Sequence, residues 1–214
     1  MVVNYSESVA QAGEVVADIQ KAGGRAIAVQ ADVSKVADVE RLFDATIKQF
    51  GKLNILINNT GIILYKPVAD TTEEEFDRIM GINAKGTFFA CQQATRRMAE
   101  GGRITNFSST LTTVIMANFT AYVASKGAIE QITHVLAKEL GPRRITVNCV
   151  APGTKDTELL GRDRTLEQNQ QYAQMAALGR LGQPEDIADV VAMLASDDAH
   201  QVTGQTLRAN GGMV

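Results

Sequence analysis

The sequence is poor in the residues that build metal sites and disulfide frameworks. Among its 214 residues there are only two cysteines, Cys91 and Cys149, and two histidines, His134 and His200. None of the four stands at metal-ligand spacing from another, and both cysteines lie in apolar segments. We therefore expect no metal site, no disulfide and two buried thiols.

The chain also lacks an excess of positive charge and a long apolar run. Its formal net charge is -3 at pH 7 and its sequence pI is about 5.5, so no general basic surface is available for nucleic acid. No apolar run reaches the length of a membrane span, and residues 1–6 do not have the basic-then-apolar pattern of a signal peptide. These absences predict a cytoplasmic protein with neither nucleic-acid nor membrane partners.

What the chain does contain is a regular alternation of strand-like and helix-like segments. Hydrophobic residues make up 45% of the chain and charged residues 21%, which suits a single globular domain over 1–214. The periodicity predicts strands at 2–4, 25–30, 53–58, 103–107, 145–151 and 205–208, and helices at 8–22, 36–50, 72–99, 121–140, 166–177 and 184–195. Such alternation predicts an α/β protein of three αβα layers with a doubly wound, mostly parallel sheet.

Tyr122 and Lys126 stand four residues apart near the start of a predicted helix, so their side chains share one helix face. A free phenol has a pKa of about 10. A lysine cation held close favours the phenolate, so we expect a lowered pKa and a tyrosine able to exchange a proton with a carbonyl or an alcohol. The alternative is a half-buried tyrosine beside a lysine whose head reaches solvent, and the pair alone does not exclude it.

Three further polar positions fall where parallel strands end or where a helix is weak. Ser109 follows the strand at 103–107 and either polarises a substrate oxygen or caps a turn. Asn58-Asn59-Thr60-Gly61 allows close approach of backbone to a ligand, or forms a plain turn. Asn83 interrupts a helical segment, where it either bends the helix and exposes a carbonyl that could hold a water, or lies on the helix surface.

Taken together, these motifs resemble the classical short-chain dehydrogenases/reductases, and the similarity runs over essentially the whole chain. The matching positions are Asn58-Asn59-x-Gly61, Asn83, Ser109, Tyr122-x-x-x-Lys126, Pro152-Gly153 with Thr157, the segment 179–188 and the ending 202–206. The resemblance is to the branch with 3-oxoacyl-acyl-carrier reductases and glucose dehydrogenases. It implies a Rossmann-like fold and hydride transfer between a nicotinamide cofactor and a ketone or secondary alcohol.

The same resemblance assigns roles to individual residues. Tyr122 would be the acid/base, Lys126 would lower its pKa and bind the nicotinamide ribose, Ser109 would orient the substrate oxygen, and Asn83 would hold a relay water. The residues expected to bind cofactor are Asn4, Tyr5, Ser6, Asp32, Val33, Asn59, Thr60, Gly61, Tyr122, Lys126, Pro152, Gly153, Lys155 and Thr157. Because Asn4-Tyr5-Ser6 brings no carboxylate to the end of its strand, NADP(H) is favoured and NAD(H) is possible.

No glycine-rich phosphate-binding turn occurs in the sequence. We therefore expect an N-terminally truncated form of the fold, with a strand missing between those that end at Asn4 and Asn58, and with two unpaired strand edges. The alternative function is a non-catalytic paralogue that serves as an oligomerising scaffold. The resemblance implies a homodimer or homotetramer paired through the helices at 72–99 and 121–140, and 154–178 is predicted to be a lid over the substrate.

Overall fold

The computed structural model of the protein describes residues 1–154 and 165–214 as an alternation of strands and helices. The strands are β1 (Val2–Tyr5), β2 (Ile27–Gln30), β3 (Leu53–Asn58), β4 (Met98–Phe107), β5 (Thr146–Val150) and β6 (Thr206–Leu207), and the α-helices are α1 (Val9–Lys21), α2 (Val36–Phe50), α3 (Glu73–Ile79), α4 (Gly86–Arg97), α5 (Thr120–Leu140), α6 (Leu166–Gln174) and α7 (Pro184–Ala195). A π-helical turn, η2 (Met80–Lys85), joins α3 to α4, and the 3-10 turn η3 (Thr110–Thr112) follows β4.

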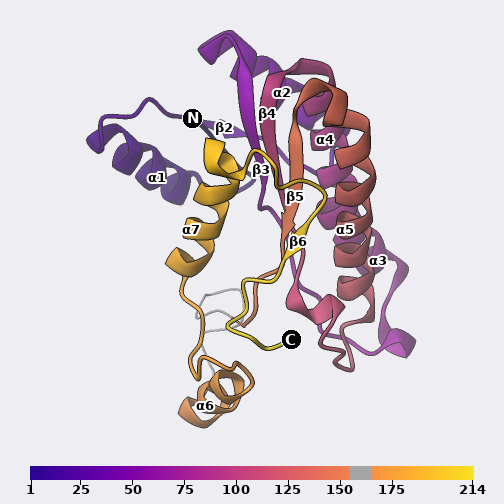
Figure 1. The fold of residues 1–214 in the computed structure, drawn as a ribbon. Helices are drawn as coiled ribbons and strands as arrows, with labels where there is room; N and C mark the ends of the chain where they lie inside the picture. Colours follow the sequence, from indigo (N-terminus) through magenta and orange to yellow (C-terminus); the bar gives the residue numbers. More distant parts are fainter. Residues whose placement is uncertain (155–164) are drawn as a thin grey trace.

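All recorded strand pairs are parallel, and helices cover the main sheet on both faces. The order of that sheet is β3-β4-β5-β6, and β1 and β2 form a separate pair. Helices α4 and α5 lie on one face of the main sheet and α7 lies on the other (Figure 1). The predicted three-layer, Rossmann-like α/β fold is therefore confirmed.

The main core lies between the sheet and the helices α2, α4 and α5. Its members include Phe43, Ala94, Ile104, Leu136 and Val147, all nearly or fully buried. Every residue of β5 is buried, as expected for a parallel strand with helices on both faces. A smaller cluster packs α7 against the opposite face. The carboxyl ends of β4 and β5 therefore stand on the most rigidly packed part of the molecule.

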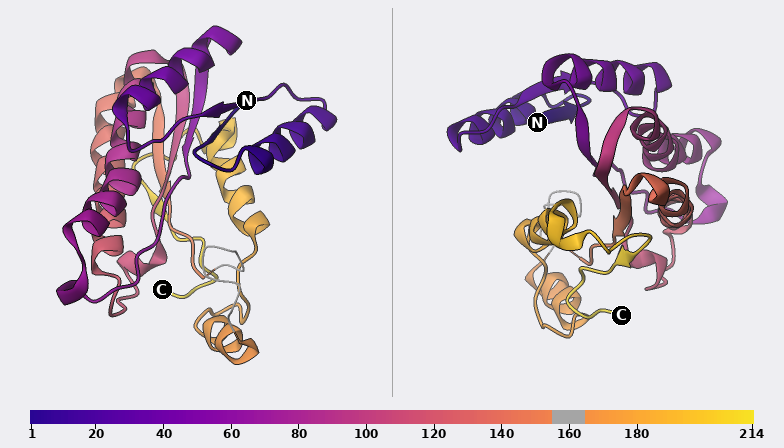
Figure 2. Two further views of the ribbon diagram at one scale, coloured as in Figure 1. Left: turned by 180° about the vertical axis from the view of Figure 1, so that it is seen from behind. Right: turned by 45° about the horizontal axis from the view of Figure 1, so that its top comes forward.

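Among the described residues, β1 pairs with β2 and β3 pairs with β4, and no pairing joins β1 to β3. The sheet is therefore interrupted between β1 and β3, as expected. In the views of Figure 2, β1, β2 and α1 lie beside the main sheet rather than within it. Ile55 and Ile57 of β3 are 45% and 37% exposed, unusual values for apolar side chains of a strand in a doubly wound sheet. The edge of β3 towards β1 is thus unpaired in the part of the chain that the structure describes.

The predicted helix over 72–99 is interrupted near Asn83, as the sequence indicated, but its end at residue 99 is wrong. Thr72 begins α3 with a capping box to Glu75, but the helix then changes to the π-helical turn η2 before α4 starts at Gly86. Residues 98 and 99 belong to β4, because Met98 pairs with Leu53 of β3. A run of apolar and small residues fits either a helix end or a buried strand, and the pairing with β3 decides between them.

None of the helices in the described residues combines the length and hydropathy needed to cross a bilayer. Within the same residues there is no group of three or more His, Cys, Asp or Glu side chains that could hold a metal ion. Both cysteines are buried and free, which confirms the expectation of buried thiols.

Candidate active site

Three of the predicted catalytic residues meet where β4 ends and α5 begins. Ser109 follows β4, Tyr122 and Lys126 lie in the first two turns of α5, and all three are buried. The Nζ of Lys126 lies 5.9 Å from the ring centroid of Tyr122 and donates a hydrogen bond of 2.9 Å to the carbonyl of Phe107. The alternative in which Lys126 reaches outward to solvent is therefore wrong, since its head is held at the strand end.

The electrostatics of the tyrosine differ from the expectation. Burial raises the pKa of the Tyr122 phenol, and a hydrogen bond from Ser109 opposes that rise only in part. Burial lowers the pKa of Lys126 to about 8. The predicted fall in the pKa of Tyr122 is thus absent, because the loss of water around the phenol outweighs the Ser109 hydrogen bond.

Asn83 is fully buried in η2, so the surface-residue alternative is wrong for it. Its Oδ1 accepts a 2.9 Å hydrogen bond from the backbone N–H of Ile62, and its Nδ2 donates to the carbonyl of Ile62 at 2.9 Å and to Oγ of Ser125 at 3.0 Å. The Asn83 carbonyl accepts a hydrogen bond from the Thr87 hydroxyl at 2.8 Å. Asn83 therefore joins the turn after β3 to α5 through its side chain.

The turn after β3 requires glycine at Gly61. A Cβ there would lie 3.1 Å from Nζ of Lys126 and 3.3 Å from Oδ1 of Asn83, closer than most side-chain contacts allow. Asn58 serves the sheet itself, since its Nδ2 donates a 2.8 Å hydrogen bond to Oδ1 of Asn106 on β4. The turn thus supports the sheet through Asn58 and approaches Lys126 closely at Gly61.

A cavity of about 760 Å³ gathers six of the fourteen residues predicted to bind cofactor. It is lined by Asn4, Tyr5, Ser6, Glu7, Ser8, Ala31, Asp32, Val33, Ser34, Thr60, Ile62, Asp77, Arg78, Gly81, Ile82 and Lys85. The sequence did not single out Asp77, Arg78 and Lys85. Asp77 and Arg78 are adjacent on α3 and Lys85 ends η2, so no helical period relates the three residues, and only the fold brings them to this cavity.

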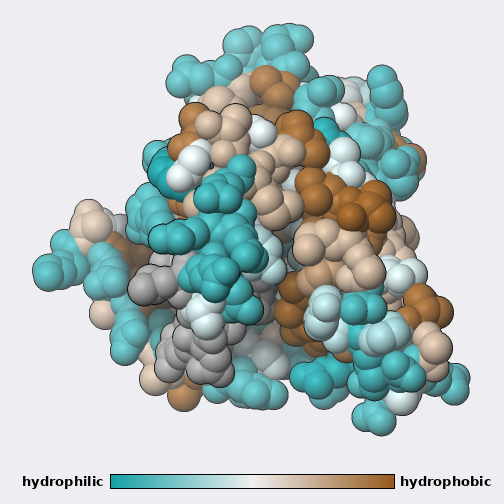
Figure 3. Space-filling model, turned by 90° about the horizontal axis from the view of Figure 1, so that it is seen from below, coloured by the Kyte–Doolittle hydropathy of each residue, from teal (hydrophilic) through white to brown (hydrophobic). Residues whose placement is uncertain are grey.

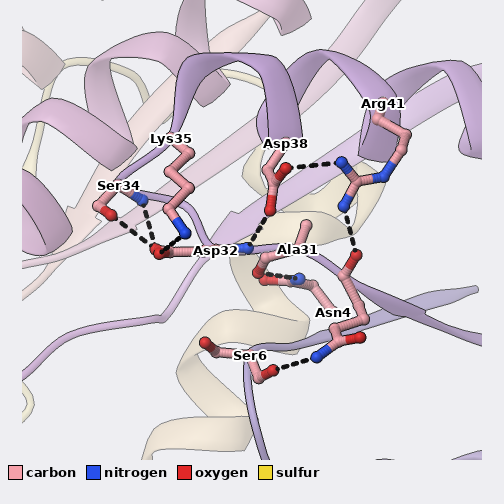
Figure 4. A network of polar contacts seen from close by, with 9 residues as sticks. Asn4, Ser6, Ala31, Asp32, Ser34, Lys35, Asp38 and Arg41 are labelled. Carbon is pink, nitrogen blue, oxygen red and sulfur yellow. Dashed lines mark hydrogen bonds and ion pairs between the residues drawn. The ribbon is translucent and has the colours of Figure 1, made fainter.

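Asp32 holds its own loop rather than pointing a free carboxylate into this cavity. Its Oδ1 accepts hydrogen bonds from N and Oγ of Ser34 at 3.0 and 2.7 Å, and Lys35 lies 3.4 Å from Oδ2 (Figure 4). These bonds, the Ser34 hydroxyl foremost, lower the pKa of Asp32. On the other strand, Nδ2 of Asn4 donates to the carbonyl of Ala31 at 3.0 Å. The side chains at the end of β1, those of Asn4, Tyr5 and Ser6, are amide and hydroxyl groups without a carboxylate.

Pro152 and Gly153 follow β5, next to the loop after β4 that contains Ser109 and Thr110. The carbonyl of Pro152 accepts a 3.0 Å hydrogen bond from the backbone N–H of Thr110, and a Cβ at Gly153 would come within 2.8 Å of the Cβ of Asn210. Lys155 and Thr157, also predicted to bind cofactor, lie outside the described residues. The predicted lid at 154–178 is described only at residue 154 and from residue 165 onward.

A second cavity of about 220 Å³ lies at the same end of the molecule. Its lining includes Thr154, Tyr172 of α6, Arg180, Arg208 and Met213. The described part of the predicted lid therefore borders an open space.

Comparisons with known proteins agree with this arrangement. The family model described as enoyl-(acyl carrier protein) reductase matches residues 1–214. An uncharacterized oxidoreductase of Methylorubrum extorquens is 45% identical over all of this chain and 87% of its own length. A probable tetrahydroxynaphthalene reductase of Zymoseptoria tritici is 39% identical over 99% of this chain and 84% of its own.

Among solved structures, an angucycline C-6 ketoreductase with bound NADP superposes with a TM-score of 0.92. It is 41% identical, over 99% of this chain and 84% of that structure. The fold and the placement of Ser109, Tyr122 and Lys126 define a nicotinamide-type oxidoreductase scaffold. On the evidence of its relatives, the chain belongs to the short-chain dehydrogenase/reductase family.

Proposed function

We propose that this protein is an NADP(H)-dependent ketoreductase in which Tyr122 is the acid/base. The observation that carries this proposal is the convergence of Ser109, Tyr122 and Lys126 at the end of β4. Gly61, whose missing side chain lets Lys126 approach the turn after β3, adjoins the same residues. The chemistry needs a proton donor, a polarising hydroxyl and a nearby cation, and the three side chains supply these groups.

The cofactor, when bound, supplies a hydride to the carbonyl carbon of the substrate. Tyr122 donates its phenolic proton to the carbonyl oxygen, so that the C=O double bond becomes a secondary alcohol. The raised pKa of Tyr122 keeps the phenol protonated at neutral pH, which is the form needed for reduction. Ser109 holds the same oxygen by a hydrogen bond, and the ammonium group of Lys126 stabilises the phenolate that remains.

The residues at the large cavity fit NADP(H) better than NAD(H). The end of β1 offers the neutral groups of Asn4, Tyr5 and Ser6, and the cavity is lined by the cations Arg78 and Lys85 as well as by the carboxylates of Glu7, Asp32 and Asp77. A 2′-phosphate suits neutral donors and cations, whereas a free 2′-hydroxyl is usually gripped by a carboxylate. The neighbour with bound NADP supports the same choice. Asp32, Val33, Asn59 and Thr60 would then line the adenosine side, and Lys126 would hold the nicotinamide ribose.

The substrate we propose is a flat, apolar ketone. The ring of Phe119 lies 6.2 Å from that of Tyr122, and the ring of Tyr65 lies 5.0 Å from that of Phe119. This row leads from the catalytic phenol to the surface, where Tyr65 is 66% and Ile115 is 81% exposed. Hydrophobic side chains also gather on this end of the molecule in Figure 3. Fused-ring names among the relatives support this class of substrate.

The test is a binding and turnover assay on the chain as it stands. NADPH fluorescence titration gives the affinity, and loss of NADPH absorbance with 1-tetralone and with cyclohexanone gives the turnover. We expect faster turnover of the fused-ring ketone, and none with Tyr122→Phe. Absence of NADPH binding at millimolar concentration would reject the proposal.

Two observations favour a second candidate, an oligomerising scaffold without catalysis. The β1–β2 pair is separate from the main sheet, and Phe88 of α4 and Val135 of α5 are 48% and 57% exposed. Such apolar side chains on adjacent helices suit pairing into a homodimer or homotetramer. Light scattering tests the oligomer, and an assembled protein without NADPH binding would support the scaffold. The cytoplasm stays the predicted compartment for either function.

A further inference from the structure

A half-buried carboxylate that the proposed chemistry does not use, that of Glu130, holds the loop around Ser109. Oε1 of Glu130 accepts a 2.6 Å hydrogen bond from the Ser108 hydroxyl and a 2.7 Å hydrogen bond from the Thr112 hydroxyl. These two residues flank Ser109 on either side. A single oxygen atom therefore fixes both ends of the short segment that presents the Ser109 side chain.

Glu130 belongs to the helix that carries the other catalytic groups. It lies on α5 one turn after Lys126 and two turns after Tyr122, so the three side chains follow one face of the helix. The loop also has its own bonds, because the Thr112 hydroxyl lies 2.9 Å from the Ser109 carbonyl and Ser109 Oγ accepts from the N–H of Leu111. Glu130 is thus a side-chain link from this compact loop to α5, beside the weaker 3.3 Å hydrogen bond from Ser108 Oγ to the Lys126 carbonyl.

The strength of this link follows from its chemistry. Hydroxyl donors to a carboxylate form short, charge-assisted bonds, about 2.5–2.7 Å long and roughly twice as strong as neutral ones. Among the described residues no lysine or arginine forms an ion pair with Glu130. The two hydroxyls therefore supply the hydrogen bonds that a half-buried carboxylate needs, and their loss would remove two of the bonds that hold the loop against α5.

We propose that Glu130 is a positioning residue that sets the Ser109 hydroxyl against the Tyr122 phenol by tying the Ser108–Thr112 loop to α5. The inference rests on the proposed ketoreductase function. A looser loop weakens the hydrogen bond from Ser109 to Tyr122. Because that bond opposes the rise in the pKa of Tyr122, the pKa then rises further. The expected signature is slower proton transfer with unchanged cofactor binding.

The test compares Glu130→Ala with Glu130→Gln, whose amide oxygen can still accept both hydroxyl bonds. For Glu130→Ala we expect kcat to fall about thirtyfold, the scale of a small misplacement of a catalytic group, with KM and NADPH Kd within about twofold. The alkaline limb of its pH–kcat profile should move to higher pH. Glu130→Gln should recover most of the rate. Glu139→Ala, at an exposed position of the same helix, should change nothing.

The double variant Ser108→Ala/Thr112→Val checks the route of the effect. It should lower kcat as Glu130→Ala does, and combining all three changes should add little, because partners in one network are not additive. The idea is overturned if Glu130→Ala keeps its kcat, if Glu130→Gln is as slow as Glu130→Ala, or if the effects simply add.

A measurement without turnover separates this inference from the proposed function. Hydrogen exchange of the ligand-free protein should show faster exchange of the amides at 109–114 in Glu130→Ala than in Glu139→Ala. Unchanged exchange there would reject the tether even in an active enzyme. Faster exchange in a protein that never reduces a ketone would keep the tether and reject the ketoreductase. If Glu130→Ala does not fold, the Ser108→Ala/Thr112→Val variant carries the same comparison.

Discussion

Two regions of the molecule are built in different ways. One is the end of the main sheet where Ser109, Tyr122 and Lys126 meet, and the other is the β1–β2 pair beside the large cavity. All five residues of β5 are buried, whereas β1 is half-buried along its whole length and β2 alternates between half-buried and exposed. The first region is held by dense apolar packing and the second by individual hydrogen bonds such as that of Asn4. The comparison indicates that the geometry of Ser109, Tyr122 and Lys126 depends on the core and that the β1–β2 pair is the less stable part.

The largest effect is expected where chemistry itself is removed. Tyr122→Phe keeps the buried ring and loses only the hydroxyl, so kcat for ketone reduction should fall about 10³-fold while NADPH affinity stays within about twofold. Steady-state kinetics and fluorescence titration measure the two quantities. A loss of rate below about tenfold would remove Tyr122 from the role of acid.

Packing should separate the two regions next. Ile104→Ala leaves a cavity at a side chain that is 1% exposed and should cost about 3 kcal/mol of unfolding free energy. Val3→Ala, in the half-buried β1, should cost about 1 kcal/mol or less. Urea denaturation measures both values. Equal costs would mean that β1 is packed as firmly as the main sheet.

The pH dependence of cofactor binding tests the lysine. With a pKa of about 8, Lys126 is mostly cationic below pH 8 and loses its charge above it, so the charged form that attracts an anionic cofactor disappears as pH rises. NADPH Kd should be flat below that value and should increase above it, by up to about tenfold per pH unit for one linked proton.

Lys126→Met is the control, and its Kd should be weaker and nearly independent of pH between 7 and 9, roughly the range in which the wild-type lysine loses its charge. The same rise in Kd for this variant would show that another group titrates.

The smallest effect is expected in the strand pair. Asn4→Ala removes the donor to the Ala31 carbonyl and should cost about 1 kcal/mol of stability, the value of one partly exposed hydrogen bond. NADPH affinity should weaken by only a few-fold. Thermal melting and titration are the measurements, and Gln11→Ala, at an exposed position of α1, is the matched control. A loss as large as that of Ile104→Ala would contradict the contrast between the regions.

Local pattern predicted most elements to within a few residues, because strands and helices of a parallel α/β protein differ clearly in hydrophobic period. It indicated the interruption at Asn83, where η2 lies, but it continued the helix to residue 99 and into β4, since the signal for pairing with Leu53 is not local. Ser109, Tyr122 and Lys126 were singled out by strand-end position and helix spacing, and their roles came from the family resemblance. Glu130 was not, because only the folded loop brings Ser108 and Thr112 to its carboxylate.

The sequence by itself determined the class of fold, the alternation of strands and helices, and the helix face shared by Tyr122 and Lys126, since these follow from periodicity and spacing. The tertiary structure decided the electrostatics and the contacts between distant segments. Burial raises the pKa of Tyr122 where spacing alone predicted a fall, and Asn83 is buried against Ile62 and Ser125. Solvent exclusion and long-range contact depend on how segments pack, and no short stretch of sequence contains that information.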